Sequence, residues 1–229
     1  NHLIRKISPD GVVTTLAGNR QVGFDGAGAV AIFNGPNDVA VRADNSIVVT
    51  NLYNHQIQLI SPAGLVTALA GCRWAGFADG SAAEAQFYNP LAIAVGPDNT
   101  VLVCDFSNNR LRQIAADNTT VSTIAGSAAF GHLDGIGGAA SFAYPSSIAV
   151  DTTGHAVVCE AGGYIRKIEL ATGKITTVTI GVNNPIFALA IDKNKNIVLI
   201  RNENTTISRL TGSLGIGPGF RSAPLPLWK

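Results

Sequence analysis

Four polar residues come directly after short β-branched runs, and they are the chain's first candidates for chemistry. Asn51, Asp105, Glu160 and Arg201 follow the runs "IVVT", "VLVC", "AVVC" and "IVLI". If the fold brings these run ends to one face, their mixed charges could form a binding surface. They could equally be solvated strand ends or partners for neighbouring arginines.

Arginine recurs at one position of the repeated "LIRKI"-type run. Arg5, Arg112 and Arg166 occupy equivalent places, and Gln58 stands there in the second copy. A repeated arginine is usually a hydrogen-bond donor held by carboxylates or carbonyls. A phosphate-binding ring is the alternative, but aromatic residues for base stacking are sparse.

The remaining acidic and imidazole groups do not predict a reactive centre. Each of three Asp-Gly pairs belongs to a different copy, so their carboxylates should be spread out; the pairs begin at Asp25, Asp79 and Asp134. Calcium favours carboxylate oxygen, but Asp-Gly is also a strong turn dipeptide. None of the histidines has a histidine partner two to four residues away; they are His2, His55, His132 and His155. We expect no catalytic residues, no metal site and no cofactor.

These residues belong to an internal repeat. Copies of the motif in "NHLIRKI" start at residues 1, 54, 108, 162 and 204, in steps of 53, 54, 54 and 42. A fixed period of this size indicates an array of supersecondary units that pack on one another.

Each unit contains four short runs rich in Val, Ile and Thr, bounded by Gly, Pro, Asn or Asp. This pattern predicts four β-strands, and no stretch shows a sustained helical period. Repeated four-stranded antiparallel blades indicate an all-β fold, the β-propeller. The chain has 229 residues, of which 46% are apolar, enough for a buried core.

Several elements recur in one order: Asn1-His2-Leu3, "IRKI", "VTTLAG", Asp-Gly, Ala-x-Phe before a proline, and an "IAV" run. In these motifs the chain resembles the NHL-repeat β-propeller family over about residues 1–210. The resemblance implies a fold but no single activity, since relatives include protein-binding platforms, RNA-binding modules, lyases, lactonases and parts of extracellular assemblies. The fourth unit departs from the pattern because it lacks the Asp-Gly segment.

The strands of a blade are lettered A to D from the central axis outward. Residues 2–18 are expected to supply strands C and D, and residues 186–210 strands A, B and a weak C. Complete blades are predicted at 36–71, 90–126 and 145–180. Either the two ends share one closing blade, or the chain is part of a larger, six-bladed propeller. The surplus C strand favours the second.

The predicted propeller domain spans residues 1–210, and residues 211–229 form a Gly/Pro-rich tail. "APLPLW" within this tail should be extended. The tail is expected to be a linker, or else a segment that packs on a neighbouring subunit through Trp228.

Composition limits the setting of the protein. Charged residues make up 14% of the chain and the net charge is +1, which argues against a generally basic nucleic-acid surface. No apolar run reaches the roughly 18 residues of a membrane span. Cys104 and Cys159 are expected to be small buried residues, with a disulfide between them as the alternative. Cys72 is the third cysteine, and it is expected either to be free or to pair with a residue outside this sequence.

Two sequons, at Asn118 and Asn204, lie in predicted turns. Together with the low charge and the lack of Met, they favour a secreted or cell-surface glycoprotein. We therefore expect a non-catalytic scaffold that binds protein partners or neighbouring subunits. The alternatives are a lactonase- or lyase-like enzyme whose metal site lies largely outside this segment, and an RNA-binding platform.

Overall fold

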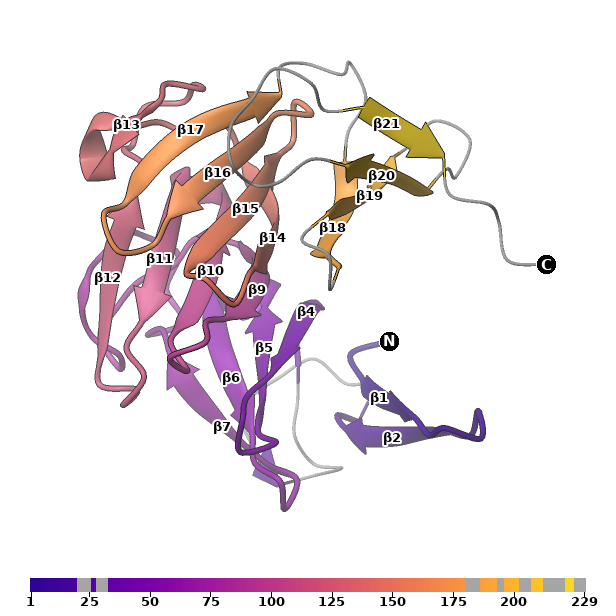
Figure 1. Cartoon of the computed structure of the whole chain (residues 1–229). Coiled ribbons are helices and arrows are strands. Elements are labelled where there is room, and N and C mark those ends of the chain that lie inside the picture. The colour runs from indigo at the N-terminus through magenta and orange to yellow at the C-terminus, as the bar shows by residue number, and fades with distance from the viewer. Residues whose placement is uncertain are drawn as a thin grey trace.

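The fold is described from a computed structural model. It describes residues 1–19, 26–27, 33–179, 186–192, 196–201, 207–211 and 221–224. Figure 1 shows antiparallel sheets arranged as a fan, and this confirms the predicted all-β propeller of four-stranded blades.

The N-terminal hairpin and four blades make up this fan. The hairpin pairs β1 (Ile4–Ile7) with β2 (Val13–Ala17). Blade I contains β4 (Pro36–Val41), β5 (Ile47–Asn51), β6 (Gln56–Ile60) and β7 (Leu65–Ala70). Blade II contains β9 (Pro90–Val95), β10 (Val101–Asp105), β11 (Arg110–Ile114) and β12 (Thr120–Ala125). Blade III contains β14 (Pro145–Val150), β15 (His155–Glu160), β16 (Ile165–Glu169) and β17 (Lys174–Thr179).

Blade IV differs from the sequence-based expectation. It contains β18 (Ile186–Ile191), β19 (Ile197–Arg201), β20 (Ile207–Thr211) and β21 (Arg221–Pro224), paired in that order. Within residues 211–229, which were predicted to be a Gly/Pro-rich tail, Arg221–Pro224 form β21, which pairs with β20. Trp228 lies outside the described residues.

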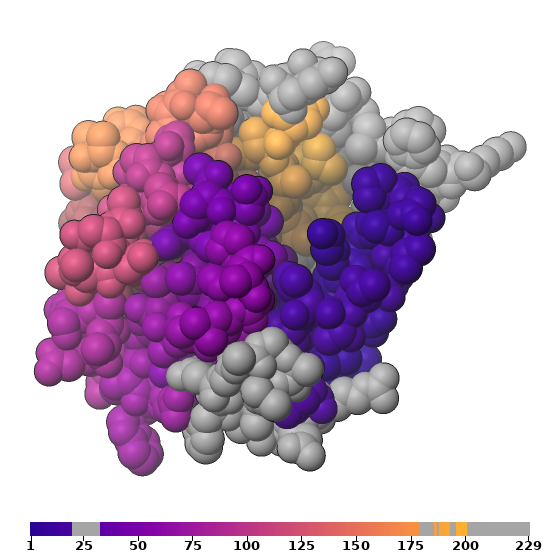
Figure 2. Space-filling model, turned by 90° about the horizontal axis from the view of Figure 1, so that it is seen from below, coloured from indigo at the N-terminus to yellow at the C-terminus, as the bar shows by residue number. Residues whose placement is uncertain are grey.

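In the part of the chain that the structure describes, the two ends lie in different sheets. Among the described residues, β1 and β2 form a sheet of their own, and β18 and β19 belong to a different sheet. In the described residues, the sheets therefore do not contain the blade shared by both ends that the first explanation predicts. Figure 2 shows the hairpin, in indigo, against the purple residues of blade I.

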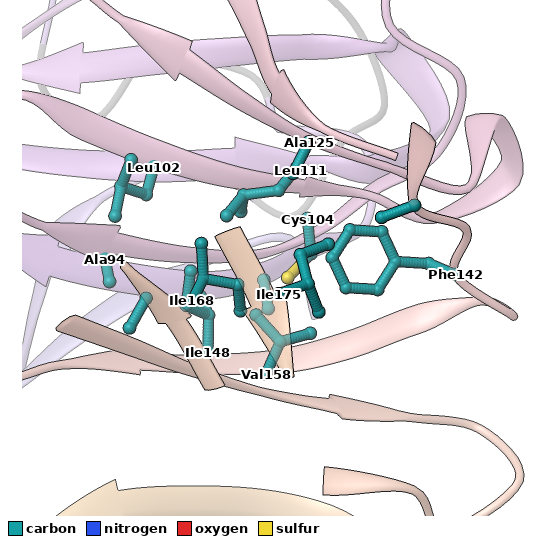
Figure 3. Close-up of a cluster of buried hydrophobic side chains, with 13 residues drawn as sticks. Ala94, Leu102, Cys104, Leu111, Ala125, Phe142, Ile148, Val158, Ile168 and Ile175 are labelled. Carbon is teal, nitrogen blue, oxygen red and sulfur yellow. The ribbon is translucent and has the colours of Figure 1, made fainter. Parts of the chain in front are cut away.

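The blade cores explain why the second strands are continuously apolar. In β10, Val101 and Val103 enter the core between blades I and II, while Leu102 and Cys104 enter the core between blades II and III. Figure 3 shows the second of these cores, where Leu102 and Cys104 lie near Ile148 on β14. Both faces of β10 are therefore buried, and its residues are apolar up to Cys104, with the polar Asp105 at the end of the strand.

The Asp-Gly segments tie each blade to the one before it. Each leads into a two-residue strand that pairs with the outermost strand of the following blade: β3 (Gly26–Ala27) with β7, β8 (Gly80–Ser81) with β12, and β13 (Gly135–Ile136) with β17. The chain therefore crosses the next blade's outer edge before it returns to the axis to begin that blade.

The glycine that ends the "LAG" motif and the histidine of the Asn-His turn lie where two backbone segments approach each other closely. Gly71 has a φ of +105°, and a Cβ there would lie 2.7 Å from the carbonyl oxygen of His55. His55 itself has a φ of 54°, and its Nδ1 accepts a hydrogen bond from the Asn89 backbone N–H at 3.2 Å. His2 makes the same bond to the Gly35 N–H. The predicted structural role of this histidine matches these contacts.

Helices in the described residues are confined to single 3₁₀ turns at Leu52–Asn54, Phe106–Asn108 and Gly137–Ala139. In the part of the chain that the structure describes, no helix is both long and apolar enough to cross a membrane.

Candidate functional site

The predicted polar residues lie at the ends of the B strands, one in each blade. The side chains of Asn51, Asp105 and Glu160 are fully buried, with 0% exposure. Arg201 ends β19, and its side chain lies outside what the structure describes. The three described side chains occupy separate blades and face arginine or glutamine of the same blade.

In blade II a buried arginine binds two carboxylates, of which Asp105 is buried and Asp79 is exposed. Arg112 on β11 donates from Nη1 to Asp105 Oδ2 at 2.8 Å and from Nη2 to Asp79 Oδ1 at 2.6 Å. It also donates to the carbonyls of Gln86 and Ala78 at 3.0 and 2.7 Å. The guanidinium is fully buried, so its charge is stabilised entirely by these acceptors.

Blade III repeats this cluster around Arg166. Its Nη1 donates to Glu160 Oε1 at 2.5 Å, and its Nη2 donates to Asp134 Oδ1 at 2.9 Å. Asp134 also accepts from the Thr177 backbone N–H at 3.0 Å. Asp79 and Asp134 are therefore more than turn residues, because each binds the arginine of the following blade. Asp25 lies outside the described residues.

Blade I carries a neutral version of the same contact. Asn51 Nδ2 donates to Gln58 Oε1 at 3.0 Å, and Asn51 Oδ1 accepts from the Asn34 backbone N–H at 2.7 Å. The backbone bond is equivalent to that from the Tyr88 N–H to Asp105 at 2.8 Å. In blade I, Asn51 stands in place of the acidic residue and Gln58 in place of the arginine, so both charges of the pair are absent together. This joint change indicates that the contact has a structural role.

Burial and hydrogen bonding act oppositely on these carboxyl groups. Burial raises the pKa of Asp105, although hydrogen bonds from Asn108, Tyr88 and Arg112 oppose the rise. The pKa of Asp134 is lowered, because hydrogen bonds from Thr177 and Arg166 outweigh partial burial. Every described carboxylate of the two clusters is occupied by donors from within the chain.

A polar cavity of about 360 Å³ lies at the hub, lined by the inner strands β4, β9, β14 and β18. Asp38 is its one carboxylate among the lining residues, and burial raises the pKa of this group. Its oxygens accept from the Val39 and Ile93 backbone N–H groups at 2.8 and 2.9 Å. Asp38 therefore links blade I to blade II. Within the described residues, no three His, Cys, Asp or Glu groups are placed to share a metal ion.

The cysteines and sequons have separate environments. Cys104 and Cys159 are buried, as expected, and no disulfide joins them; Cys72 is half-buried. Asn118 lies in the turn between β11 and β12, where its Oδ1 accepts from Arg42 Nη2 at 2.6 Å. Asn204 lies outside the described residues.

An aromatic row, which the sequence did not single out, covers the face opposite the A–B and C–D turns. Its members come from the B–C turns and from the connections between blades. Phe106 stacks on Tyr144 with ring centroids 4.9 Å apart, and Phe130 meets Tyr144 edge-on at 5.3 Å. His132 continues the row by stacking on Tyr164 at 3.6 Å. We call these residues, with the exposed Tyr53, Trp74, Phe77 and Tyr88, the aromatic face.

His132 joins this face to the buried cluster below it. Its Nδ1 contacts Glu160 Oε2, the same carboxylate group that binds Arg166. A sequence signal did exist: all four tyrosines of the chain fall next to B–C turns or before the proline that starts a blade. That placement puts them on one face of a propeller.

Comparisons with known proteins agree with this architecture. Residues 87–114, which run from the end of one connection through β11, match the NHL repeat. Over 91 residues, or 39% of its length, the chain is 35% identical to Protein SUPPRESSOR OF QUENCHING 1, chloroplastic, of Arabidopsis thaliana. That match spans 9% of the plant protein.

Solved structures resemble the chain in fold. A virginiamycin B lyase from Staphylococcus aureus matches 98% of the chain and 62% of its own length, with a TM-score of 0.61 and 15% identity. A streptogramin B lyase gives a TM-score of 0.62 at 18% identity, over 100% of the chain and 63% of its own. A Bacteroides thetaiotaomicron protein of unknown function gives 0.59 at 24% identity, over 73% and 42%.

The chain thus spans less than two thirds of each of these proteins, and identities this low indicate a shared fold only. The match at residues 87–114 shows an NHL repeat within blade II, and the solved structures show that the chain shares the β-propeller fold.

Proposed function

We propose that the protein is a non-catalytic scaffold that binds a protein partner through the aromatic face. The observation that carries this proposal is the row of exposed rings, including Tyr53, Trp74 and Phe130. Aromatic residues are enriched in protein interfaces and often dominate binding energy there. Charged side chains nearby, such as Arg112 and Glu160, are already held by internal ion pairs.

The rigidity of the row supports the same proposal. Phe106, Tyr144 and Phe130 contact one another, and Arg110 lies 3.8 Å from the centroid of the Phe77 ring. Rings that are held in place before binding lose little conformational entropy when a partner docks. The blades therefore present a preformed surface, and the buried clusters beneath it keep the connections in position.

The test is affinity capture with quantitative mass spectrometry on three forms of the protein. They are the unchanged chain, the variant Tyr53→Ala/Phe130→Ala, and the control Val12→Ala/Leu65→Ala, in which Val12 lies in the β1–β2 turn and Leu65 is the first residue of β7. A partner that supports the proposal is lost from the first variant only and rebinds as a purified component. Equal loss from both variants, or no purified partner that discriminates them, would refute it.

We also propose an extracellular or cell-surface setting with a glycan at Asn118. The sequon lies in a C–D turn, and its neighbours Asp117 and Thr119 are exposed. Expression through a eukaryotic secretory pathway should give a mass that falls on treatment with peptide N-glycosidase and in the Asn118→Gln variant. An unchanged mass would remove the glycoprotein part of the proposal.

A further inference from the structure

A cavity of about 320 Å³ lies between blades II and III, at the end of the blades where their A–B and C–D turns lie. The A–B turn of blade II lines it with Pro97, Asp98 and Thr100, and blade III lines it with residues 153–154 and 170–171 of its two turns. Leu102, which belongs to the core between these blades, lines it as well. We call this space the turn cavity. It lies on the face opposite the aromatic face.

The corresponding space between blades I and II is occupied by an arginine of the chain. Arg42 starts the A–B turn of blade I, "RADNS", where Gly96 starts the turn of blade II, "GPDNT". The same hydrogen bond closes both turns, because the N–H of the first residue donates to the carbonyl of the fifth, at 2.9 and 2.8 Å. Arg42 is 5% exposed, and its Nη2 donates to Asn118 Oδ1 at 2.6 Å, in the C–D turn of blade II. The arginine therefore bridges the two blades.

The path of the Arg42 side chain maps onto the turn cavity. The C–D turns of blades II and III have the same register, which makes Thr172 the equivalent of Asn118. Thr172 directly follows Ala171, which lines the turn cavity. A side chain that ran from position 96 as Arg42 runs from position 42 would therefore enter this cavity. Gly96 has no side chain to fill it.

The charge of the turn cavity suits a cation. Asp98 lines it, and none of its lining residues, all of which the structure describes, carries a positive charge. The hydroxyl of Thr100 donates to Asp98 Oδ1 at 2.7 Å, and this hydrogen bond lowers the pKa of Asp98, so its carboxylate is ionised at neutral pH. In blade I the equivalent carboxylate, that of Asp44, interacts electrostatically with Arg42.

Apolar and amide groups complete the match to an arginine side chain. Leu102 belongs to the core between the blades and Leu170 packs against that core, so together they offer apolar surface to a methylene stem. The half-buried Gln113 has an amide oxygen that can accept from a guanidinium group. A guanidinium is planar, pairs well with a carboxylate and is more weakly hydrated than an ammonium group, so arginine suits this partly apolar site better than lysine.

We propose that the turn cavity binds the guanidinium group of an arginine side chain on a partner polypeptide. The stem of that side chain lies on Leu102 and Leu170, and its guanidinium pairs with Asp98. A partner bound here uses the chemistry by which Arg42 already joins blades I and II, but between two molecules. The site goes beyond the partner binding proposed for the aromatic face, and it lies on the other side of the blades.

Four ligands test this site on the full chain. N-acetyl-arginine amide carries the arginine side chain as a polypeptide presents it. N-acetyl-citrulline amide has the same shape without the charge, and N-acetyl-lysine amide has the charge without the guanidinium. Free arginine separates an amino-acid ligand from the side chain of a partner. Each is titrated into the isotope-labelled protein, and nuclear magnetic resonance reads binding from the backbone amide signals of Asp98, Thr153 and Leu170.

Two exchanges of turns locate the binding. The filled variant gives blade II the turn of blade I, through Gly96→Arg/Pro97→Ala/Thr100→Ser. The opened variant gives blade I the turn of blade II, through Arg42→Gly/Ala43→Pro/Ser46→Thr. Both turns already exist in this chain, so both variants should fold, and circular dichroism checks this.

A single substitution tests the charge of the cavity. Asp98→Asn removes that charge with little change of shape, and Asp44→Asn in blade I is its matched control. A Cβ at position 96 would lie 2.7 Å from Asp98 Oδ1, so the filled variant requires a small shift of that side chain. Asp98→Asn, at an exposed residue, tests the site without such a shift.

We expect the arginine amide to give saturable shifts at the turn cavity of the unchanged chain. Loss of charge, in the citrulline ligand or in Asp98→Asn, should weaken binding about three- to fivefold, as for a partly exposed charge pair. The lysine ligand should bind more weakly than the arginine amide, and Asp44→Asn should leave binding unchanged. The filled variant should lose the shifts, and the opened variant should gain a second set near Asn118.

Several results would overturn the proposal. They are a lack of saturable shifts in the unchanged chain, equal binding of the arginine amide and either the citrulline or the lysine ligand, binding that survives in the filled variant, and a folded opened variant without a second set of shifts. Tighter binding of free arginine than of the arginine amide would make the ligand a free amino acid instead of a partner chain. Capture of a partner by the aromatic face would be unaffected by any of these outcomes.

Discussion

Exchanging the buried ion pair of blade II for the neutral pair of blade I tests the structural role of these clusters. The variants are Asp105→Asn, Arg112→Gln and the double variant. Asp105→Asn leaves Arg112 with Asp79 at 2.6 Å, so the cost should be near the lower limit for breaking a buried pair, about 3 kcal/mol. Arg112→Gln removes the cation from both carboxylates, and its cost should be larger, about 4–5 kcal/mol.

The double variant reproduces the contact between Asn51 and Gln58, which are joined by a 3.0 Å hydrogen bond. It should be no less stable than Asp105→Asn alone, because the two introduced amides can bind each other and neither faces an unmatched buried charge. Urea unfolding followed by circular dichroism measures this through the midpoints at unchanged slope. A double variant that loses the full sum of the two single costs would show that the groups act independently and would refute the reasoning.

Three further predictions concern acid stability, core packing and thiol reactivity. The pKa of Asp134 is lowered in the folded state, so its contribution to stability is present above the unfolded pKa of about 3.9 and is lost as pH falls through the folded pKa. The variant Asp134→Asn should therefore lose less stability in acid, as measured by urea titrations at pH 2–6. An unchanged dependence of stability on pH would contradict this prediction. Phe87→Ala empties a fully buried site between blades and should lower the free energy of unfolding by about 3–5 kcal/mol, whereas Phe130→Ala on the surface should change it by less than about 1 kcal/mol. Burial raises the pKa of the Cys104 thiol well above its usual value, and the nearby Asp38, Cys159 and Asp105 raise it further. A thiol reagent at neutral pH should therefore modify the half-buried Cys72 first. Rapid modification of Cys104 in the folded protein would contradict this prediction.

The repeat made most strands predictable from the sequence. Short β-branched runs bounded by turn residues predicted the blades at 36–71, 90–126 and 145–180. Each blade supplies four strands of a five-stranded sheet, whose fifth strand is the two-residue strand from the preceding connection. The strand β21 was not predicted, because the Gly- and Pro-rich stretch before Arg221 has no alternating pattern of apolar and polar residues. Its place is set by pairing with β20, which is a tertiary contact rather than a local preference.

The candidate site was only partly predictable. The sequence suggested that carboxylates hold the repeated arginines, and Asp105 with Arg112 does so within one blade. It did not suggest Asp79 as the second partner, which lies 33 residues away and reaches Arg112 only because β8 folds back along β12. The joint change from Asp and Arg to Asn51 and Gln58 was the available signal for the pairing.

Asp105 with Arg112 and Glu160 with Arg166 form ion pairs that are fully buried within blades II and III. Side-chain exchange of the arginine guanidinium protons, measured by nuclear magnetic resonance, tests this burial most directly. The protons of Arg112 and Arg166 should exchange with water far more slowly than those of the exposed Arg5, and adding the Asp105→Asn change should speed exchange at Arg112 only. Exchange at Arg112 and Arg166 as fast as at Arg5 would contradict the account.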